Sequence, residues 1–263
     1  MKLEIITKKP KLKTRETSIL FVHGYWHAAW CWSENFMDYF AEHGIETHAL
    51  SLRGHGNSEG AEKIRWTPLS KFVDDLVQVY NQIDGSPILL GHSMGGMIIQ
   101  KYLENHNASS AIFLASAHPK GALPTVFRMF KSHPLAFMKA NFTFNSYHMI
   151  AKPNHYRDAF FSNDFPEKQL KEYHTLLKTD SFRAFMDMIF LDLPNPKKVN
   201  NIPMLMLGGT DDVIVSSKEV KTMAKTYEAE VDIFQGMGHA MMLEKNWKQV
   251  ADRIISWIDK QGL

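Results

Sequence analysis

The pentapeptide Gly91-His-Ser-Met-Gly95 constrains this chain more than any other feature, because it joins a predicted strand to a predicted helix. The run Pro87–Leu90 is short and apolar, as in a buried strand, and a helical pattern follows from Met97 to Tyr102. Side chains at the two glycine positions would clash in so sharp a turn. The pattern predicts a strained turn that presents the Ser93 hydroxyl above a sheet edge as a nucleophile.

Strand-like and helix-like stretches alternate along most of the chain. Short runs rich in apolar residues predict strands at Ser18–Val22, Ile45–Leu50, Pro87–Leu90, Ala111–Ala115, Pro203–Leu207 and Val231–Phe234. Helical signals lie between and after them: a pattern over Trp32–Glu42, Thr67 as N-cap with Pro68 at the first helical position, a capping box at Ser216–Glu219, and a C-terminal helix that buries Val250, Ile254, Trp257 and Ile258. Strand runs that are apolar throughout predict an α/β fold whose mostly parallel sheet has helices on both faces.

Residues 119–200 interrupt this alternation with a helical pattern. We therefore expect residues 1–118 and 201–263 to form one α/β core, and residues 119–200 to form a helical cap inserted into it. The insertion holds 11 of the 17 phenylalanines and also Met129, Met138, Met149, Met186 and Met188. Such side chains suit the wall of an apolar substrate pocket, but they equally suit the interior of the cap itself.

A serine hydroxyl is a weak nucleophile and needs a neighbouring base, which a carboxylate must orient. His239 follows Gly236-Met-Gly238 in the loop after the last predicted strand, where it can reach over the sheet edge. Asp211 and Asp212 follow the strand Pro203–Leu207 and lie at the same edge. Both acids fit the chain order Ser–Asp–His. Asp211 is preferred because it stands first after the turn, and Asp212 is the alternative.

Acyl transfer also needs hydrogen-bond donors for a tetrahedral oxyanion. The backbone N–H of Met94, directly after the serine, is one candidate. The backbone N–H of Tyr25, in the loop that follows the strand Ser18–Val22, is the other. His23 in the same loop is interpreted as a structural histidine that hydrogen-bonds the loop.

Together these sites resemble the α/β-hydrolase superfamily, and Arg53-Gly-His-Gly-Asn-Ser58 looks like a loop common in its microbial esterases and lipases. The segment His23–Trp32 is similar to the plant methylesterase and hydroxynitrile lyase group. The lyases carry Thr where this chain has Gly24, and Lys where it has Ala240. The resemblance therefore implies hydrolysis of esters on Ser93, with a cap that roofs the site.

Composition restricts the partners of the chain. The 30 Lys and Arg nearly balance the 28 Asp and Glu, which does not suggest a nucleic-acid partner. The single cysteine, Cys31, excludes an intrachain disulfide. A charged N-terminus and the lack of a long apolar run predict a cytoplasmic protein without an integral membrane contact. No metal-binding motif occurs, so we expect neither a metal nor another cofactor.

The leading hypothesis is a carboxylic-ester hydrolase of the esterase or lipase type, with a small-molecule ester as its partner. Thioesterase or acyltransferase chemistry would use the same residues. A ligand-binding receptor on the same scaffold is the alternative from another class. The sequence leaves the natural substrate, its chain length and the oligomeric state open.

Overall fold

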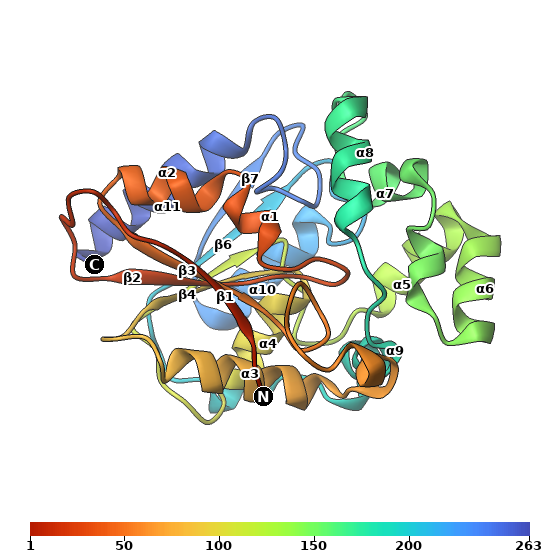
Figure 1. The fold of residues 1–263 in the computed structure, drawn as a ribbon, viewed down its shortest axis with the longest axis horizontal. Helices are drawn as coiled ribbons and strands as arrows, with labels where there is room; N and C mark the ends of the chain where they lie inside the picture. The colour runs from red at the N-terminus through yellow and green to blue at the C-terminus, as the bar shows by residue number, and fades with distance from the viewer.

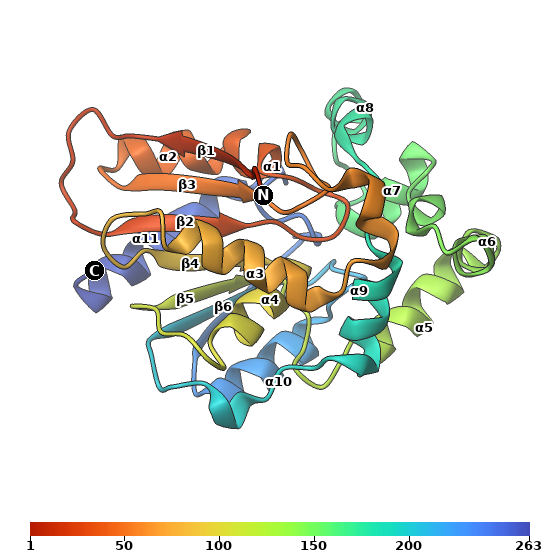
Figure 2. The same cartoon turned by 60° about the horizontal axis from the view of Figure 1, so that its bottom comes forward.

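The computed structural model describes every residue from Met1 to Leu263. Its centre is a seven-stranded sheet in the order β1-β3-β2-β4-β5-β6-β7 (Figures 1 and 2). The strands are β1 (Glu4–Lys8), β2 (Ser18–Val22), β3 (Glu46–Ser51), β4 (Ile88–His92), β5 (Ala111–Leu114), β6 (Met204–Gly209) and β7 (Glu230–Phe234). Neighbouring strands run parallel except β1, which pairs antiparallel with β3. The predicted α/β class with a mostly parallel sheet is confirmed.

Helices cover both faces of the sheet (Figure 2). One face carries α1 (Trp30–Ser33), α2 (Phe36–Glu42) and α11 (Trp247–Gln261), and the other carries α3 (Leu69–Tyr80), α4 (Met94–Tyr102) and α10 (Ser217–Tyr227). With both faces covered, the central strands β2, β4 and β5 are buried along their whole length. The capping box at Ser216–Glu219 is confirmed, as are the four predicted buried residues of α11.

Between β5 and β6 the chain forms only helices. They are α5 (Leu123–Ser132), α6 (Pro134–Thr143), η2 (Ser146–Met149), α7 (Pro153–Phe160), α8 (Glu167–Leu176), α9 (Phe182–Met186), η3 (Asp187–Leu191) and η4 (Pro196–Lys198). In Figure 1 helices α5 to α8 stand at the right, beyond the end of the sheet. We call residues 119–200 the helical segment.

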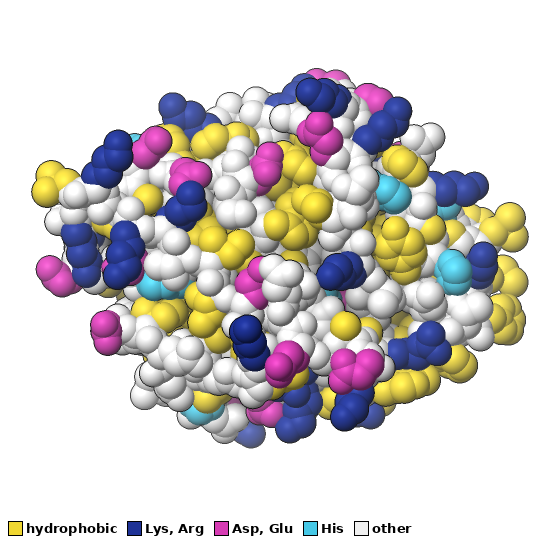
Figure 3. All heavy atoms as spheres, viewed as in Figure 1, with side chains coloured by type: hydrophobic (Ala, Val, Ile, Leu, Met, Phe, Trp, Pro, Cys, Tyr) yellow, Lys and Arg dark blue, Asp and Glu magenta, His cyan; other side chains and the backbone are white.

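The surface of the helical segment is unusually apolar. Figure 3 shows hydrophobic side chains gathered at the end of the molecule that α5 and α6 occupy. Large exposed side chains there are Phe127, Phe130, Leu135, Met138 and Phe142. None of the helices in the protein combines the length and the hydropathy needed to cross a bilayer.

Three local predictions differ from the structure. The edge strand β1 has no predicted counterpart, because its sequence Glu-Ile-Ile-Thr-Lys is short and flanked by charges. The helix predicted over Trp32–Glu42 is two helices, α1 and α2, which meet at Glu34 and Asn35.

The start of α3 is the third difference. Pro68 is extended and occupies the N-cap, so the helix begins at Leu69 and the predicted cap at Thr67 is wrong. The Thr67 hydroxyl donates back to the carbonyl of Lys63 instead. A carboxylate distant in sequence, Asp187, accepts the Leu69 N–H at 2.9 Å. A tertiary contact therefore supplies the acceptor that the local sequence lacks.

Candidate active site

Ser93 lies at the junction of β4 and α4 in a backbone conformation that few residues adopt. Its φ is 51° and its ψ is −115°. Such geometry costs about 1–3 kcal/mol and persists only where the surroundings impose it. A Cβ on Gly91 would lie 2.7 Å from the backbone of Gly95, and a Cβ on Gly95 would lie 2.2 Å from the carbonyl oxygen of Val22. The two glycines therefore allow β2, β4 and α4 to approach closely enough to form the turn. The predicted strain at Ser93 is confirmed.

His239 is buried, and its Nδ1 lies 2.7 Å from Oδ2 of Asp212. The other carboxylate oxygen of Asp212 accepts the N–H groups of Ile214 at 2.7 Å and Val215 at 2.8 Å. These contacts fix the carboxylate and require the hydrogen on Nδ1 of His239. Nε2 is then the free basic nitrogen, and it is buried without a hydrogen-bond partner.

The preference for Asp211 as the partner of His239 is wrong. Asp211 is exposed, and its carboxylate accepts a hydrogen bond from the Thr210 hydroxyl at 2.8 Å. Its own N–H donates to the carbonyl of Met237 at 3.0 Å, which holds the loop backbone so that the next residue points inward. The alternative, Asp212, occupies the position beside His239.

The two candidate oxyanion donors lie beside Ser93. The backbone N–H groups of Tyr25 and Met94 have no acceptor within the protein. Met94 is the first residue of α4, whose N-terminal N–H groups are free to bind an anion. Tyr25 belongs to the loop after β2, and a Cβ on the preceding Gly24 would lie 3.0 Å from the Cβ of Ser93. This close approach brings the Tyr25 backbone to the serine.

His23 is a structural histidine, as predicted. Its Nε2 accepts the Leu52 N–H at 3.0 Å, and its Nδ1 lies 2.8 Å from the carbonyl oxygen of Gly24. Burial, reinforced by the nearby His55, lowers the pKa of His23 to about 3. Burial likewise lowers the pKa of His27 to about 4 and holds the pKa of His92 well below its usual range. These three rings are therefore neutral at pH 7.

An apolar cavity opens above Ser93 and His239. Fourteen of its nineteen lining residues are hydrophobic. Ser93, Ala117 and His239 line it from the sheet side, and Met129, Phe137, Ala140, Met149, Phe160, Phe182, Phe185 and Met188 line it from the helical segment. Few polar groups lie there to bind a polar ligand. No group of three or more His, Cys, Asp or Glu side chains is placed to hold a metal ion.

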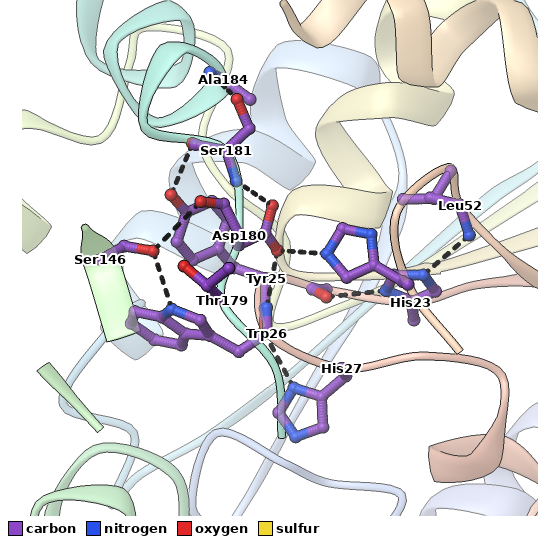
Figure 4. A network of polar contacts seen from close by, with 12 residues as sticks. His23, Tyr25, Trp26, His27, Leu52, Ser146, Thr179, Asp180, Ser181 and Ala184 are labelled. Carbon is purple, nitrogen blue, oxygen red and sulfur yellow. Dashed lines mark hydrogen bonds and ion pairs between the residues drawn. The ribbon is translucent and has the colours of Figure 1, made fainter. Parts of the chain in front are cut away.

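Two buried carboxylates at this site had no signal in the sequence. Asp180 of the helical segment accepts the backbone N–H of Trp26, directly after Tyr25 (Figure 4). It also forms an ion pair with His55. Glu244 accepts the N–H groups of Gly238, directly before His239, and of Ser162 in the helical segment. Both bridge the helical segment to a loop of the site. Asp180 is separated from Trp26 by 154 residues, so no local pattern reveals the contact.

Comparisons with known proteins find relatives in sequence and in fold. The chain is 25% identical to a monoacylglycerol lipase from Mycolicibacterium smegmatis over 266 residues, which cover 91% of this chain and 87% of that protein. An esterase from Exiguobacterium antarcticum superposes with a TM-score of 0.77 at 19% identity, over 98% of this chain and 95% of that one. A monoacylglycerol lipase from Paleococcus ferrophilus superposes with a TM-score of 0.71 at 18% identity, over 98% of each chain.

A bromoperoxidase from Bacillus anthracis shares the fold as closely, with a TM-score of 0.72 at 18% identity over 98% of this chain and 96% of that one. Likeness to solved structures at this level of identity establishes the fold and leaves the reaction open. The sequence model of the Alpha/beta hydrolase family matches residues 19–253, nearly the whole chain. This protein therefore belongs to the alpha/beta hydrolase family.

Proposed function

We propose that this protein hydrolyses carboxylic esters with an apolar acyl or aromatic part, through an acyl-enzyme on Ser93. The observation that carries the proposal is the apolar cavity with Ser93 and the Asp212-paired His239 in its wall. Similarity to proteins named esterase and monoacylglycerol lipase supports the same reaction. In this proposal residues 119–200 act as a cap that closes the site from water.

The reaction begins when Nε2 of His239 accepts the proton of the Ser93 hydroxyl and Oγ attacks the ester carbonyl. Asp212 stabilises the imidazolium that forms and keeps the ring in the correct tautomer. The carbonyl oxygen becomes an oxyanion and accepts hydrogen bonds from the backbone N–H groups of Tyr25 and Met94. His239 then returns the proton to the leaving alcohol. Water, activated by the same histidine, releases the acid from Ser93.

The cavity supports an apolar substrate in particular. Each methylene of an acyl chain that leaves water for such a wall contributes up to about 0.8 kcal/mol. If part of that energy is felt in the transition state, kcat/KM rises severalfold for every two carbons until the cavity is full. A cap that merely packs on itself would leave a narrow site, for which acetate would be the best substrate.

The test is kcat/KM for p-nitrophenyl esters from C2 to C12, each below its critical micelle concentration. We expect activity to rise with length and then level off. The Ser93→Ala variant should lose about 10⁴–10⁶ in kcat with the fold intact, and a fluorophosphonate should label Ser93. Labelling of another serine would refute the nucleophile. A steady fall from C2 would refute the apolar substrate and leave the hydrolase assignment standing.

A further inference from the structure

The loop that carries the Tyr25 N–H is strained at its next residue. Trp26 has a φ of 66°, in the left-handed region that a bulky side chain rarely occupies. Such a conformation persists only where surrounding contacts impose it. The strand β2 ends at Val22 and does not extend to this residue. The contacts that hold Trp26 must therefore come from elsewhere.

They come from the cap. Oδ2 of Asp180 accepts the Trp26 N–H at 2.7 Å, and the Trp26 indole N–H donates to the Ser146 hydroxyl at 3.1 Å. The Tyr25 hydroxyl donates to the carbonyl of Ser181 at 2.6 Å. In Figure 4 the Asp180 carboxylate lies between the backbone N–H groups of Trp26 and Ser181. Trp26 N–H belongs to the peptide unit that follows Tyr25, so Asp180 controls the orientation of the backbone beside the oxyanion donor.

Asp180 has a charged partner in the core. Nε2 of His55 lies 2.9 Å from Oδ2 of Asp180, and Nδ1 of His55 lies 3.0 Å from the carbonyl oxygen of Arg53. Oxygen atoms lie close to both ring nitrogens, and this arrangement favours the imidazolium form of His55. The carboxylate raises the pKa of His55 against the opposing effect of burial, and the imidazolium lowers the pKa of Asp180.

The remaining oxygen of Asp180 is also occupied. Oδ1 accepts the N–H of Ser181 at 2.6 Å. The carboxylate therefore accepts two backbone N–H groups and forms an ion pair with His55, and both side chains are fully buried. A side chain with this many contacts has no rotational freedom, and the Trp26 N–H is held as rigidly as the core.

We propose that Asp180 is a positioning residue for the oxyanion hole, with His55 as its counterion. The cap thereby completes the site: it orients the backbone at Trp26 and, through it, the Tyr25 N–H. This inference rests on the proposed ester hydrolysis. It predicts that the cap affects the chemical step as well as substrate binding.

The test is Asp180→Ala, which removes the acceptor of the Trp26 N–H. Loss of a single oxyanion donor lowers kcat by about 10²–10³-fold, so a misplaced donor should cost on the order of tenfold to a hundredfold. KM for a p-nitrophenyl ester should stay within about threefold. A trifluoromethyl ketone, whose adduct with Ser93 carries an oxyanion, should bind more weakly in parallel with the fall in kcat/KM.

A matched control is Asp187→Ala. Asp187 is an equally buried cap carboxylate that accepts a backbone N–H, that of Leu69, and pairs with Arg183. It touches no loop of the site, so its loss should lower the melting temperature without lowering kcat. If Asp180→Ala does not fold, Asp180→Asn replaces it. An amide offers one acceptor oxygen to the two N–H groups and carries no charge to pair with His55, so a smaller fall in kcat at constant KM is expected.

Equal kcat losses in the Asp180 and Asp187 variants would overturn the proposal, as would a change confined to KM or an unchanged affinity for the ketone. Failure of the ester-hydrolase function is distinguishable, because wild-type protein would then cleave no ester. Active wild-type protein, inactive Ser93→Ala and fully active Asp180→Ala would overturn the positioning role alone.

Discussion

The α/β core and the proposed cap, residues 119–200, hold their parts of the site in different ways. In the core, backbone contacts dominate: Ser93 is fixed by glycines that allow close approach, and Asp212 is fixed by two N–H groups. In the cap, side chains dominate, and most of those that face the cavity are Phe or Met. Ten of the fifteen large hydrophobic side chains exposed on the protein also belong to residues 119–200, so the cap packs less completely than the core.

This difference implies two kinds of response to substitution. A close-packed backbone turn tolerates little change in geometry. Substitutions among the core residues of the site should therefore have all-or-none effects: each either abolishes activity or leaves it unchanged. Phe and Met side chains in a partly open layer can readjust, so substitutions in the cap should give graded effects on substrate preference. Asp180 does not fit this division, because it belongs to the cap but contacts Trp26 and His55 of the core.

Beyond loss of the nucleophile itself, the largest effect expected in the core concerns the two neighbouring aspartates. Asp212→Asn should lower kcat by about 10⁴, because the amide no longer fixes the tautomer of His239 or stabilises its imidazolium. Asp211→Asn should lower kcat less than tenfold, since Asp211 is exposed and makes no contact with the histidine. Steady-state kinetics of the two variants shows which aspartate acts with His239. The reverse pattern would transfer the role to Asp211 and break the account of the core.

A second prediction concerns stability at the buried junction of core and cap. The folded pKa values of His23, His27 and His92 lie below their usual value of 6.5. Below pH 6.5 the unfolded chain therefore binds protons that the folded chain does not, so stability falls as the pH falls and is fully present only above 6.5. Each histidine contributes up to about 1.4 kcal/mol per pH unit.

Denaturant unfolding measured between pH 6 and pH 5 detects this effect. Four less buried histidines also have lowered pKa values and add to the same fall: His48, His118, His148 and His155. Carboxylates titrate mainly below that range, and His55, whose pKa is raised, is protonated in both states there. We expect the free energy of unfolding to fall by about 4 kcal/mol as the pH falls from 6 to 5. Such a fall is a large part of the total free energy of unfolding, which is about 5–15 kcal/mol for native proteins. A free energy that does not change over this range would show that the three histidines take up protons in the folded state.

The smallest effect is expected in the cap and uses one helix as its own control. Phe137 of α6 lines the cavity, whereas Phe142 of the same helix is 79% exposed and does not. Phe137→Ala should lower kcat/KM for a C8 ester by about tenfold through lost apolar contact, with acetate changed less than twofold. Phe142→Ala should change neither. A uniform loss across all chain lengths in Phe137→Ala would show that the cap responds like the core.

Much of the fold was predictable because the signals are local. Apolar runs bounded by glycines and helix caps predict six of the seven strands, and each is observed within a few residues of its predicted bounds. Strand β1 lacked such a signal, because only two of its five residues are apolar and charged residues stand at both of its ends. The start of α3 was missed for a different reason: its acceptor, Asp187, lies 118 residues away.

By itself the sequence determined the α/β class, the strained turn at Ser93 and the position of His239, because each depends on a short run whose chemistry acts within a few residues. Only the tertiary structure decided between Asp211 and Asp212, since adjacent residues carry the same side chain and differ only in the direction that the loop backbone gives them. Tertiary structure alone also revealed Asp180 and Glu244. Their hydrogen-bond partners are distant in sequence, and a buried carboxylate is recognisable only when the donors around it are known.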